Sequence, residues 1–189
     1  MAGEYIYNLQ QLTKQYDKVT VLDQVQLAFY FGAKIGVIGG NGSGKSSLLR
    51  ILAGKLLPET GEVVIPSNAR VGYLPQEMML NSDKTIYDET VVAFNEIMQL
   101  RDDIDRYAAE IAARDDYESD SYHRLIHKLS DANEHYQLLG GQSMDADVEK
   151  VLSGLGFLRR DFERPVAEFS YGWQMRVEIA KILLRKPDL

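Results

Sequence analysis

The glycine-rich stretch from Gly39 to Ser46 constrains the fold of this chain more than any other feature of its sequence. Its residues, Gly-Gly-Asn-Gly-Ser-Gly-Lys-Ser, match the phosphate-binding pattern G-x-x-x-x-G-K-[ST]. The glycines allow the backbone to bend so that successive N–H groups point inward at an anion. A helix that begins directly after the loop adds its N-terminal dipole and its unpaired N–H groups. The pattern therefore predicts a loop that cradles phosphate groups.

The residues on both sides of this stretch support that interpretation. Residues 34–39, Lys-Ile-Gly-Val-Ile-Gly, form a short apolar run that ends in glycine. Such a run is typical of a buried parallel strand just before a ligand-binding turn. Residues 46–53 are expected to form a helix, because Leu48, Leu49 and Leu52 fall on one side of it. We therefore predict an α/β core in which a strand enters the loop and a helix leaves it.

Two side chains of the loop have specific expected roles. Lys45 can reach the β- and γ-phosphates of a nucleotide, and Ser46 can place its hydroxyl on Mg²⁺. The alternative is a glycine-rich structural turn that binds nothing. The predicted nucleotide-binding residues of the loop are Gly39, Gly40, Asn41, Gly42, Ser43, Gly44, Lys45, Ser46 and Ser47.

Further strands are predicted before and after the loop. Apolar residues alternate with other residues over 5–9 and 25–29, as they do in half-buried strands. The ranges 61–65 and 70–74 are two more strand candidates. The first 75 residues are therefore expected to hold strands and turns around one helix.

The middle and the end of the chain are predicted to be helical. Apolar residues recur at roughly helical spacing over 85–112 and 122–139, with a polar stretch between them. Two long helices joined by a short polar loop suggest an antiparallel helical hairpin. The last helix is expected to start at Ser170 and to end before Pro187.

Composition excludes several kinds of site. The chain has no cysteine, so neither a disulfide framework nor a thiolate metal site is possible. The three histidines, His123, His127 and His135, do not form the zinc-protease pattern. No signal-peptide pattern and no apolar run of membrane-spanning length is present. We therefore expect a cytoplasmic location without membrane insertion.

The net charge of −7 arises in one central segment. Residues 77–140 contain 15 acidic and 6 basic residues, whereas the rest of the chain has a small positive balance. Nothing in the overall charge favours nucleic-acid binding, because a phosphate backbone attracts an excess of Lys and Arg. A contact of this segment with RNA would depend on a few basic side chains.

Three further stretches resemble the ATP-binding domains of ABC-type ATPases. Residues 12–22 resemble the stretch that contacts adenine, and residues 72–77, Gly-Tyr-Leu-Pro-Gln-Glu, resemble the Q-loop. Residues 168–177 resemble the signature sequence at the start of its helix. The resemblance covers nearly the whole chain outside its middle segment. It implies an incomplete P-loop NTPase core of the ABC type, in the α/β class, with an antiparallel β subdomain and a helical hairpin insertion.

The same resemblance implies roles for particular residues. Tyr16 would stack its ring on adenine, and Gln76 would offer its amide oxygen to Mg²⁺ or to the attacking water. Lys45 and Gln76 are the predicted catalytic residues within this chain. Ser170 and Gly172 would act across a domain dimer on ATP held by the opposite domain, and Ser170 would also cap its helix. The alternatives are a core tyrosine, an ordinary turn and an ordinary capped helix.

The signature stretch departs from the usual Ser-Gly-Gly-Gln in two places. Tyr171 replaces the first glycine, and Trp173 replaces the glutamine. Tyrosine adds bulk and resists positive φ. The run from Trp173 to Arg176, Trp-Gln-Met-Arg, resembles the first ABC domain of ABC-F proteins, which are the soluble family members that act on ribosomes.

Two other features agree with the ABC-F resemblance. The chain lacks membrane segments, and 94 positions separate Gln76 from Ser170. ABC-F proteins carry an extra helical hairpin, the arm, in their first ABC domain. The expected organisation is an ATP-binding core with the phosphate loop and Q-loop over 1–84, an arm-like insertion over 85–140, and a signature-helix region over 141–189.

The resemblance implies an ATPase that binds ATP and Mg²⁺ and couples ATP binding and hydrolysis to ribosome binding and translation. Its partners would be a second ABC domain and the RNA and protein of the ribosome. The family's catalytic Glu and switch histidine would lie beyond Leu189, so these 189 residues alone are expected not to hydrolyse ATP. Two alternatives are the ATP-binding subunit of an ABC membrane transporter and a nucleotide-dependent binding module without turnover.

Overall fold

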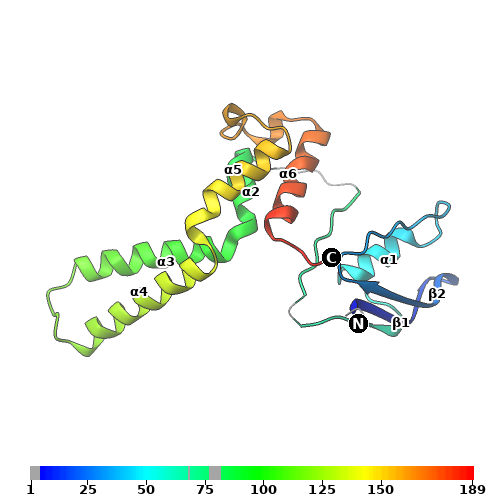
Figure 1. Cartoon of the computed structure of the whole chain (residues 1–189), viewed down its shortest axis with the longest axis horizontal. Helices are drawn as coiled ribbons and strands as arrows, with labels where there is room; N and C mark the ends of the chain where they lie inside the picture. The colour runs from blue at the N-terminus through cyan, green and yellow to red at the C-terminus, as the bar shows by residue number, and fades with distance from the viewer. Residues whose placement is uncertain (1–4, 68, 77–81) are drawn as a thin grey trace. The chain divides into compact units, whose positions relative to one another are not determined.

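Two separate hydrophobic cores divide the chain into two structural units in the computed structural model, which describes residues 5–67, 69–76 and 82–189 (Figure 1). The first unit contains Met1–Gln76 together with Lys186–Leu189. The second unit contains Glu77–Arg185. The strands belong to the first unit, and all but one of the α-helices of the described residues belong to the second.

The first unit is built on a three-stranded antiparallel sheet. Its strands are β1 (Tyr5–Tyr16), β2 (Val19–Tyr30) and β3 (Thr60–Val64), in the order β2-β1-β3. A tight turn joins β1 to β2, and Asp17 in that turn has a positive φ of 53°. Positive φ in a two-residue hairpin turn matches the twist of the flanking strands. The strands predicted over 5–9, 25–29 and 61–65 are confirmed within β1, β2 and around β3.

Helix α1 (Lys45–Leu52) packs on this sheet. Its buried residues Leu48, Ile51 and Leu52 share a core with residues of β1, including Tyr7 and Leu9. The Tyr7 hydroxyl donates a hydrogen bond to the backbone oxygen of Leu52 at 2.7 Å, and burial raises the pKa of that hydroxyl. The sheet and α1 therefore form one packed body, in which the Tyr7 hydrogen bond joins the end of α1 to the first residues of β1.

The strands predicted over 34–39 and 70–74 are wrong for the structure described here. Neither range is part of the sheet, and the side chains of Ile35 and Val37 are 55% and 41% exposed. A parallel strand needs neighbours that supply its hydrogen bonds and cover both faces. Among the described residues, the sheet offers these ranges no partner. Only a short pairing occurs, in which Gly72 N donates to the Leu189 backbone oxygen at 2.8 Å.

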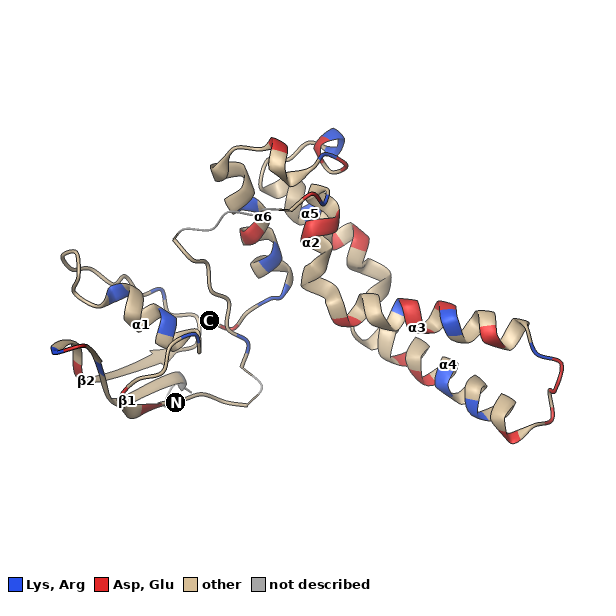
Figure 2. Ribbon diagram, turned by 180° about the vertical axis from the view of Figure 1, so that it is seen from behind, with Lys and Arg blue, Asp and Glu red and all other residues tan. Residues whose placement is uncertain are grey.

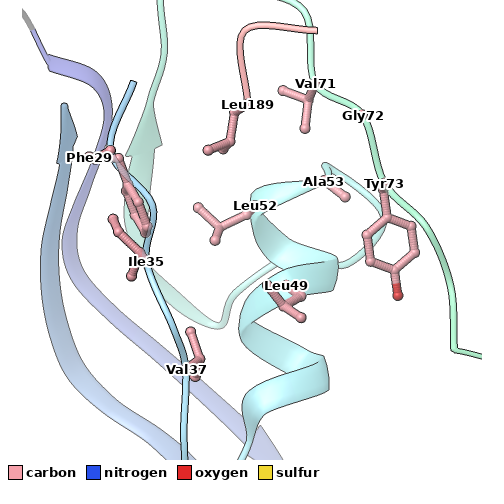
Figure 3. Close-up of a pocket in the computed structure, with 11 residues that line it drawn as sticks. Phe29, Ile35, Val37, Leu49, Leu52, Ala53, Val71, Gly72, Tyr73 and Leu189 are labelled. Carbon is pink, nitrogen blue, oxygen red and sulfur yellow. The ribbon is translucent and has the colours of Figure 1, made fainter. Parts of the chain in front are cut away.

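An apolar pocket lies between α1 and these two extended segments. Ile35, Val37, Leu49, Leu52 and Leu189 are among the residues that line it, and Figure 3 shows Leu52 extending from α1 toward Ile35. Ile35 and Val37 therefore line a pocket beside α1, although the backbone ladder of the predicted strand is not formed.

The second unit is helical. Its helices are α2 (Ile86–Val91), α3 (Asn95–Ala112), α4 (Asp120–Leu138), α5 (Met144–Gly154) and α6 (Tyr171–Leu184). The core combines buried residues of α2, α5 and α6 with those of the loop before α6. The most deeply buried members are Ile86, Val148, Leu152, Val166, Val177 and Ala180. No helix in the described part of the chain has the length and apolar character to cross a membrane.

Helices α3 and α4 form an antiparallel hairpin, and both figures show them side by side (Figures 1 and 2). Ser119 caps α4 by accepting a hydrogen bond from Tyr122 N at 3.1 Å. The connecting loop is held by Arg114, whose Nε donates to Asp116 Oδ1 at 2.8 Å. That pair holds the pKa of Asp116 well below its usual range. Figure 2 shows acidic residues along both helices with a few basic ones among them.

The first predicted helix, over 85–112, is broken in the structure. Thr85 caps α2 by accepting from Asp88 N at 3.0 Å, and α2 ends at Val91. A short 3₁₀ turn follows, and Phe94 leaves the helical region with φ −108° and ψ 31° before α3 begins. The break lets α2 pack in the core of the second unit while α3 continues into the hairpin. The final predicted helix is confirmed as α6.

Candidate functional site

The glycine-rich loop takes the bent shape that its sequence predicts. Gly42 and Gly44 have φ values of 80° and 85°, in the left-handed region that favours glycine. Gly44 is the N-cap residue of α1, so the loop ends where the helix begins. A Cβ atom at Gly44 would lie only 2.6 Å from the backbone oxygen of Val21. Both the backbone conformation and the close approach of β2 therefore require glycine at this position.

Lys45 lies against the loop with its side chain folded back. Its Nζ donates hydrogen bonds to the backbone oxygens of Gly39 at 2.9 Å and Gly40 at 2.6 Å. Gly39 to Gly42 are exposed to solvent. The ammonium group and the N-terminus of α1 are thus at the same open loop, where an anion can reach both.

Tyr16 is brought to the same helix from the end of β1. Its hydroxyl and the Ser47 Oγ are 3.2 Å apart, although 31 positions separate the two residues. The ring is 44% exposed, so part of its surface is available for stacking. The structure therefore places Tyr16, Lys45, Ser47 and the glycines of the loop together in the first unit.

Lys14 supports Tyr16, and the sequence analysis did not identify it. Its Nζ lies 5.4 Å from the centroid of the Tyr16 ring and donates to Glu59 Oε1 at 2.8 Å. Glu59 also accepts from Gln15 N at 2.9 Å. The hydrogen bonds from Lys14 and then from Gln15 lower the pKa of Glu59. Lys14 and Tyr16 are two positions apart, which puts them on the same face of a strand. That spacing could have identified Lys14 as a neighbour of Tyr16.

The remaining predicted site residues lie elsewhere in the chain. Gln76 is exposed in a bend at the end of the first unit's main segment, and Glu77, which ends the predicted Q-loop, lies outside the described residues. Ser170 and Gly172 belong to the second unit. Their roles toward a nucleotide stay predictions.

The predicted side-chain cap at Ser170 is wrong. Ser170 is the N-cap residue of α6, but its side chain accepts no capping hydrogen bond. Its backbone oxygen accepts from Trp173 N at 2.9 Å and Gln174 N at 3.0 Å. The Gln174 side chain holds this turn instead, because its Nε2 donates to the Phe169 backbone oxygen at 3.0 Å.

The residues at the loop are suited to bind a nucleoside triphosphate together with Mg²⁺. The loop and Lys45 supply donors for phosphates, and Tyr16 supplies an aromatic face near the same helix. Within the described ranges, no three His, Asp or Glu side chains gather to form a metal site. Mg²⁺ commonly binds through one or two protein oxygens together with substrate phosphates, and Ser46 would supply such an oxygen.

This combination of phosphate loop, aromatic residue and helical second unit defines an ABC-type ATP-binding domain. A sequence profile of the family described as "ABC transporter" matches residues 22–189. The chain belongs to the ABC transporter family. The resemblance to ABC-F proteins is also confirmed: ABC transporter F family member 5 of Arabidopsis thaliana is 36% identical over 182 residues, which cover 96% of this chain and 26% of that protein.

Two bacterial proteins have a similar level of sequence identity to this chain. The energy-dependent translational throttle protein EttA of Mycobacterium tuberculosis is 37% identical over 189 residues, covering 99% of this chain and 32% of that protein. The tylosin resistance ATP-binding protein TlrC of Streptomyces fradiae is 37% identical over 187 residues, covering 96% of this chain and 33% of that protein. The chain therefore spans about a third or less of the length of these relatives.

Solved structures agree on the fold. A dimeric bacterial ABC transporter cassette has a TM-score of 0.61 and 20% identity, with 96% of this chain and 70% of that chain covered. An ATP-binding subunit of an ABC transporter has a TM-score of 0.60 and 19% identity, with 96% and 63% covered. At these identities the similarity shows the fold alone, a mixed α/β ABC cassette with an antiparallel sheet and helices.

Proposed function

We propose that this chain binds ATP and Mg²⁺ as part of an ABC-F ATPase that couples ATP binding and hydrolysis to ribosome binding and translation. The observation that carries the nucleotide site is the phosphate loop, with Lys45 and Tyr16 beside it in the first unit. Lys45 would contact the β- and γ-phosphates, Ser46 would hold Mg²⁺, and Tyr16 would stack on adenine.

The second unit would complete the nucleotide site of another ABC domain. Ser170 and Gly172, in an exposed turn at the start of α6, would meet the phosphates of ATP held by that domain. Gln76 would orient the attacking water or bind Mg²⁺.

The proposed role in translation has three supports. A relative is named an energy-dependent translational throttle protein. The stretch from Trp173 to Arg176 resembles the signature region of the first ABC domain of ABC-F proteins. Helices α3 and α4 form a hairpin within residues 85–140, where the arm of an ABC-F protein would lie. Membrane transport is the alternative function, and the hairpin experiment below distinguishes the two.

Tyr16→Ala is expected to weaken ATP binding about 5- to 150-fold, because stacking of a base on an aromatic ring contributes roughly 1–3 kcal/mol. Tyr16→Phe should stay within about threefold of the wild type, since it keeps the ring and loses only the contact with Ser47. Isothermal titration calorimetry with ATP and with inorganic triphosphate measures both effects. An equal loss of triphosphate affinity in Tyr16→Ala would show that the tyrosine does not act on the base.

Shortening the hairpin is expected to weaken ATP-dependent co-sedimentation of the full-length protein with ribosomes by about tenfold or more, since an interface depends on a few central contacts. Residues 101–132 would be replaced by a short glycine-serine turn. Deletion of all of 85–140 would also remove Ile86 and Glu89, which are buried in the second unit. The shortened protein should keep its ATP affinity, and undiminished co-sedimentation would exclude the hairpin from the mechanism.

A further inference from the structure

Trp173 is the only tryptophan of the chain, and three side chains surround it in the second unit. Its ring centroid is 5.0 Å from that of Phe157 and 6.5 Å from that of Phe169. The guanidinium carbon of Arg176 lies 4.1 Å from the Trp173 ring centroid. Aromatic rings that meet at a tilt and a cation over an indole ring are both favourable arrangements. We call Phe157, Phe169 and Arg176 the Trp173 cage.

The loop that carries Phe157 fits closely against this cage. Gly156 has a φ of 92°, and a Cβ atom there would be 3.1 Å from Arg176 Nη1 and 3.7 Å from the Trp173 ring. Arg176 Nη1 also donates to the Leu155 backbone oxygen at 2.8 Å. The cage therefore fixes α6 to the end of α5 as well as to the residues directly before α6.

Gln174 makes a second attachment on the same turn of α6. Its Nε2 donates to the backbone oxygens of Phe169 at 3.0 Å and Val166 at 3.4 Å. The side chain of Ser170 makes no cap on the helix. The turn from Ser170 to Gly172 is exposed, whereas the two residues that follow it are anchored by these contacts.

We propose that Trp173 and Gln174 are positioning residues for the exposed turn from Ser170 to Gly172. They hold its backbone in the shape that meets the phosphates of a nucleotide on another ABC domain, an inference that rests on the proposed function. Trp173 replaces the usual signature glutamine, and its ring is directed into the cage. The amide that holds the turn belongs to the next residue, Gln174.

The first test is the steady-state ATPase activity of the full-length protein. Trp173→Ala and Gln174→Ala are each expected to lower kcat about tenfold, because a misplaced phosphate contact acts mainly on the transition state. The ATP affinity of the phosphate loop, measured by calorimetry, should stay within about twofold. Trp173→Phe should restore most of kcat, since a phenyl ring still fills the cage. Phe31→Ala, which removes a 76% exposed aromatic residue from the turn after β2, is the matched control.

The second test uses the fluorescence of Trp173 in the chain itself. Arg176→Met should shift the emission of Trp173, whereas Gln174→Ala should leave it unchanged because that variant keeps the cage. If Trp173→Ala does not fold, Gln174→Ala tests the proposal alone. Unchanged kcat in Gln174→Ala, or a kcat in Trp173→Phe as low as in a folded Trp173→Ala, would overturn it. Failure of the wild-type protein to bind ATP would instead refute the proposed function.

Discussion

Lys45→Ala is expected to weaken ATP binding by about 2–3 kcal/mol, which is roughly 30- to 150-fold in Kd, because the variant loses charged hydrogen bonds to the phosphates. Among the described residues, the ammonium donates hydrogen bonds to the backbone oxygens of Gly39 and Gly40 at an exposed loop. Its removal should therefore leave the fold intact. Isothermal titration calorimetry with ATP and Mg²⁺ measures the affinity, and circular dichroism checks the fold.

The matched control for this prediction is Lys55→Ala. Lys55 follows α1 at its other end, where its Nζ lies 5.3 Å from the centroid of the Tyr73 ring. Both variants remove one positive charge, so a nonspecific effect of net charge on ATP would weaken both equally. An affinity of folded Lys45→Ala equal to that of the wild type would refute the assignment of the loop as the phosphate site.

Lys181→Met is expected to destabilise the second unit by about 3–5 kcal/mol, because it leaves two buried carboxylates without their cation. Lys181 Nζ donates to Glu89 Oε1 at 2.8 Å and also forms an ion pair with Glu178. Ser82 Oγ donates to the second oxygen of Glu89 at 2.9 Å. The Lys181, Glu89 and Glu178 side chains are only 13%, 11% and 12% exposed. Urea unfolding followed by Trp173 fluorescence reports this unit selectively.

Glu178→Gln is the control for this ion-pair cluster. Among the described residues, Glu178 Oε1 has no partner with hydrogen-bond geometry, although it is buried. Glu178→Gln removes this negative charge and leaves the contact between Lys181 and Glu89 in place. It should therefore lower the free energy of unfolding of the second unit by less than about 1 kcal/mol. If Glu178→Gln destabilises the unit as much as Lys181→Met, the cluster does not depend on its shared cation.

The pH dependence of stability should differ between the wild type and Lys181→Met. Burial raises the pKa of Glu89, but hydrogen bonds from Lys181 and Ser82 outweigh it and leave the pKa below its ordinary value of 4.5. The ionised Glu89 therefore contributes to the free energy of unfolding above pH 4.5, and this contribution is lost as the pH falls through the lowered pKa of Glu89. Burial lowers the pKa of Lys181, but its two carboxylates leave it above 10.5, so that contribution is lost only at strongly alkaline pH. The two proteins should therefore differ most near neutral pH.

The phosphate loop could be predicted because its chemistry is local. The glycines, Lys45 and the first turn of the following helix are adjacent in sequence, and the backbone there needs few distant partners. Tyr16 could be placed only through a family resemblance, because its contact with Ser47 spans 31 positions. Lys14 was missed for the same reason, since the Glu59 that holds it lies 45 positions away.

Longer-range packing explains the wrong or missing predictions. The apolar run over 34–39 predicted a buried parallel strand, but a strand also needs hydrogen-bonding neighbours that an apolar run cannot supply. Periodicity alone did not reveal the break at Phe94, which depends on how α2 packs in its core. The cap at Ser170 was inferred from residue type, whereas the side chain that holds the turn belongs to Gln174.

The contact between Tyr16 and Ser47 has a consequence for how tightly a ligand can bind. It joins the predicted base-stacking ring to the helix that carries the phosphate loop, at an oxygen–oxygen distance of 3.2 Å. The Tyr16 ring and the phosphate loop would each bind one end of the same nucleotide. Once one end is bound, the effective concentration of the other end at its own subsite is raised. Adenosine and triphosphate supplied as separate molecules gain no such advantage. Nucleotide affinity at this site would thus arise as much from avidity within one molecule as from the strength of either contact.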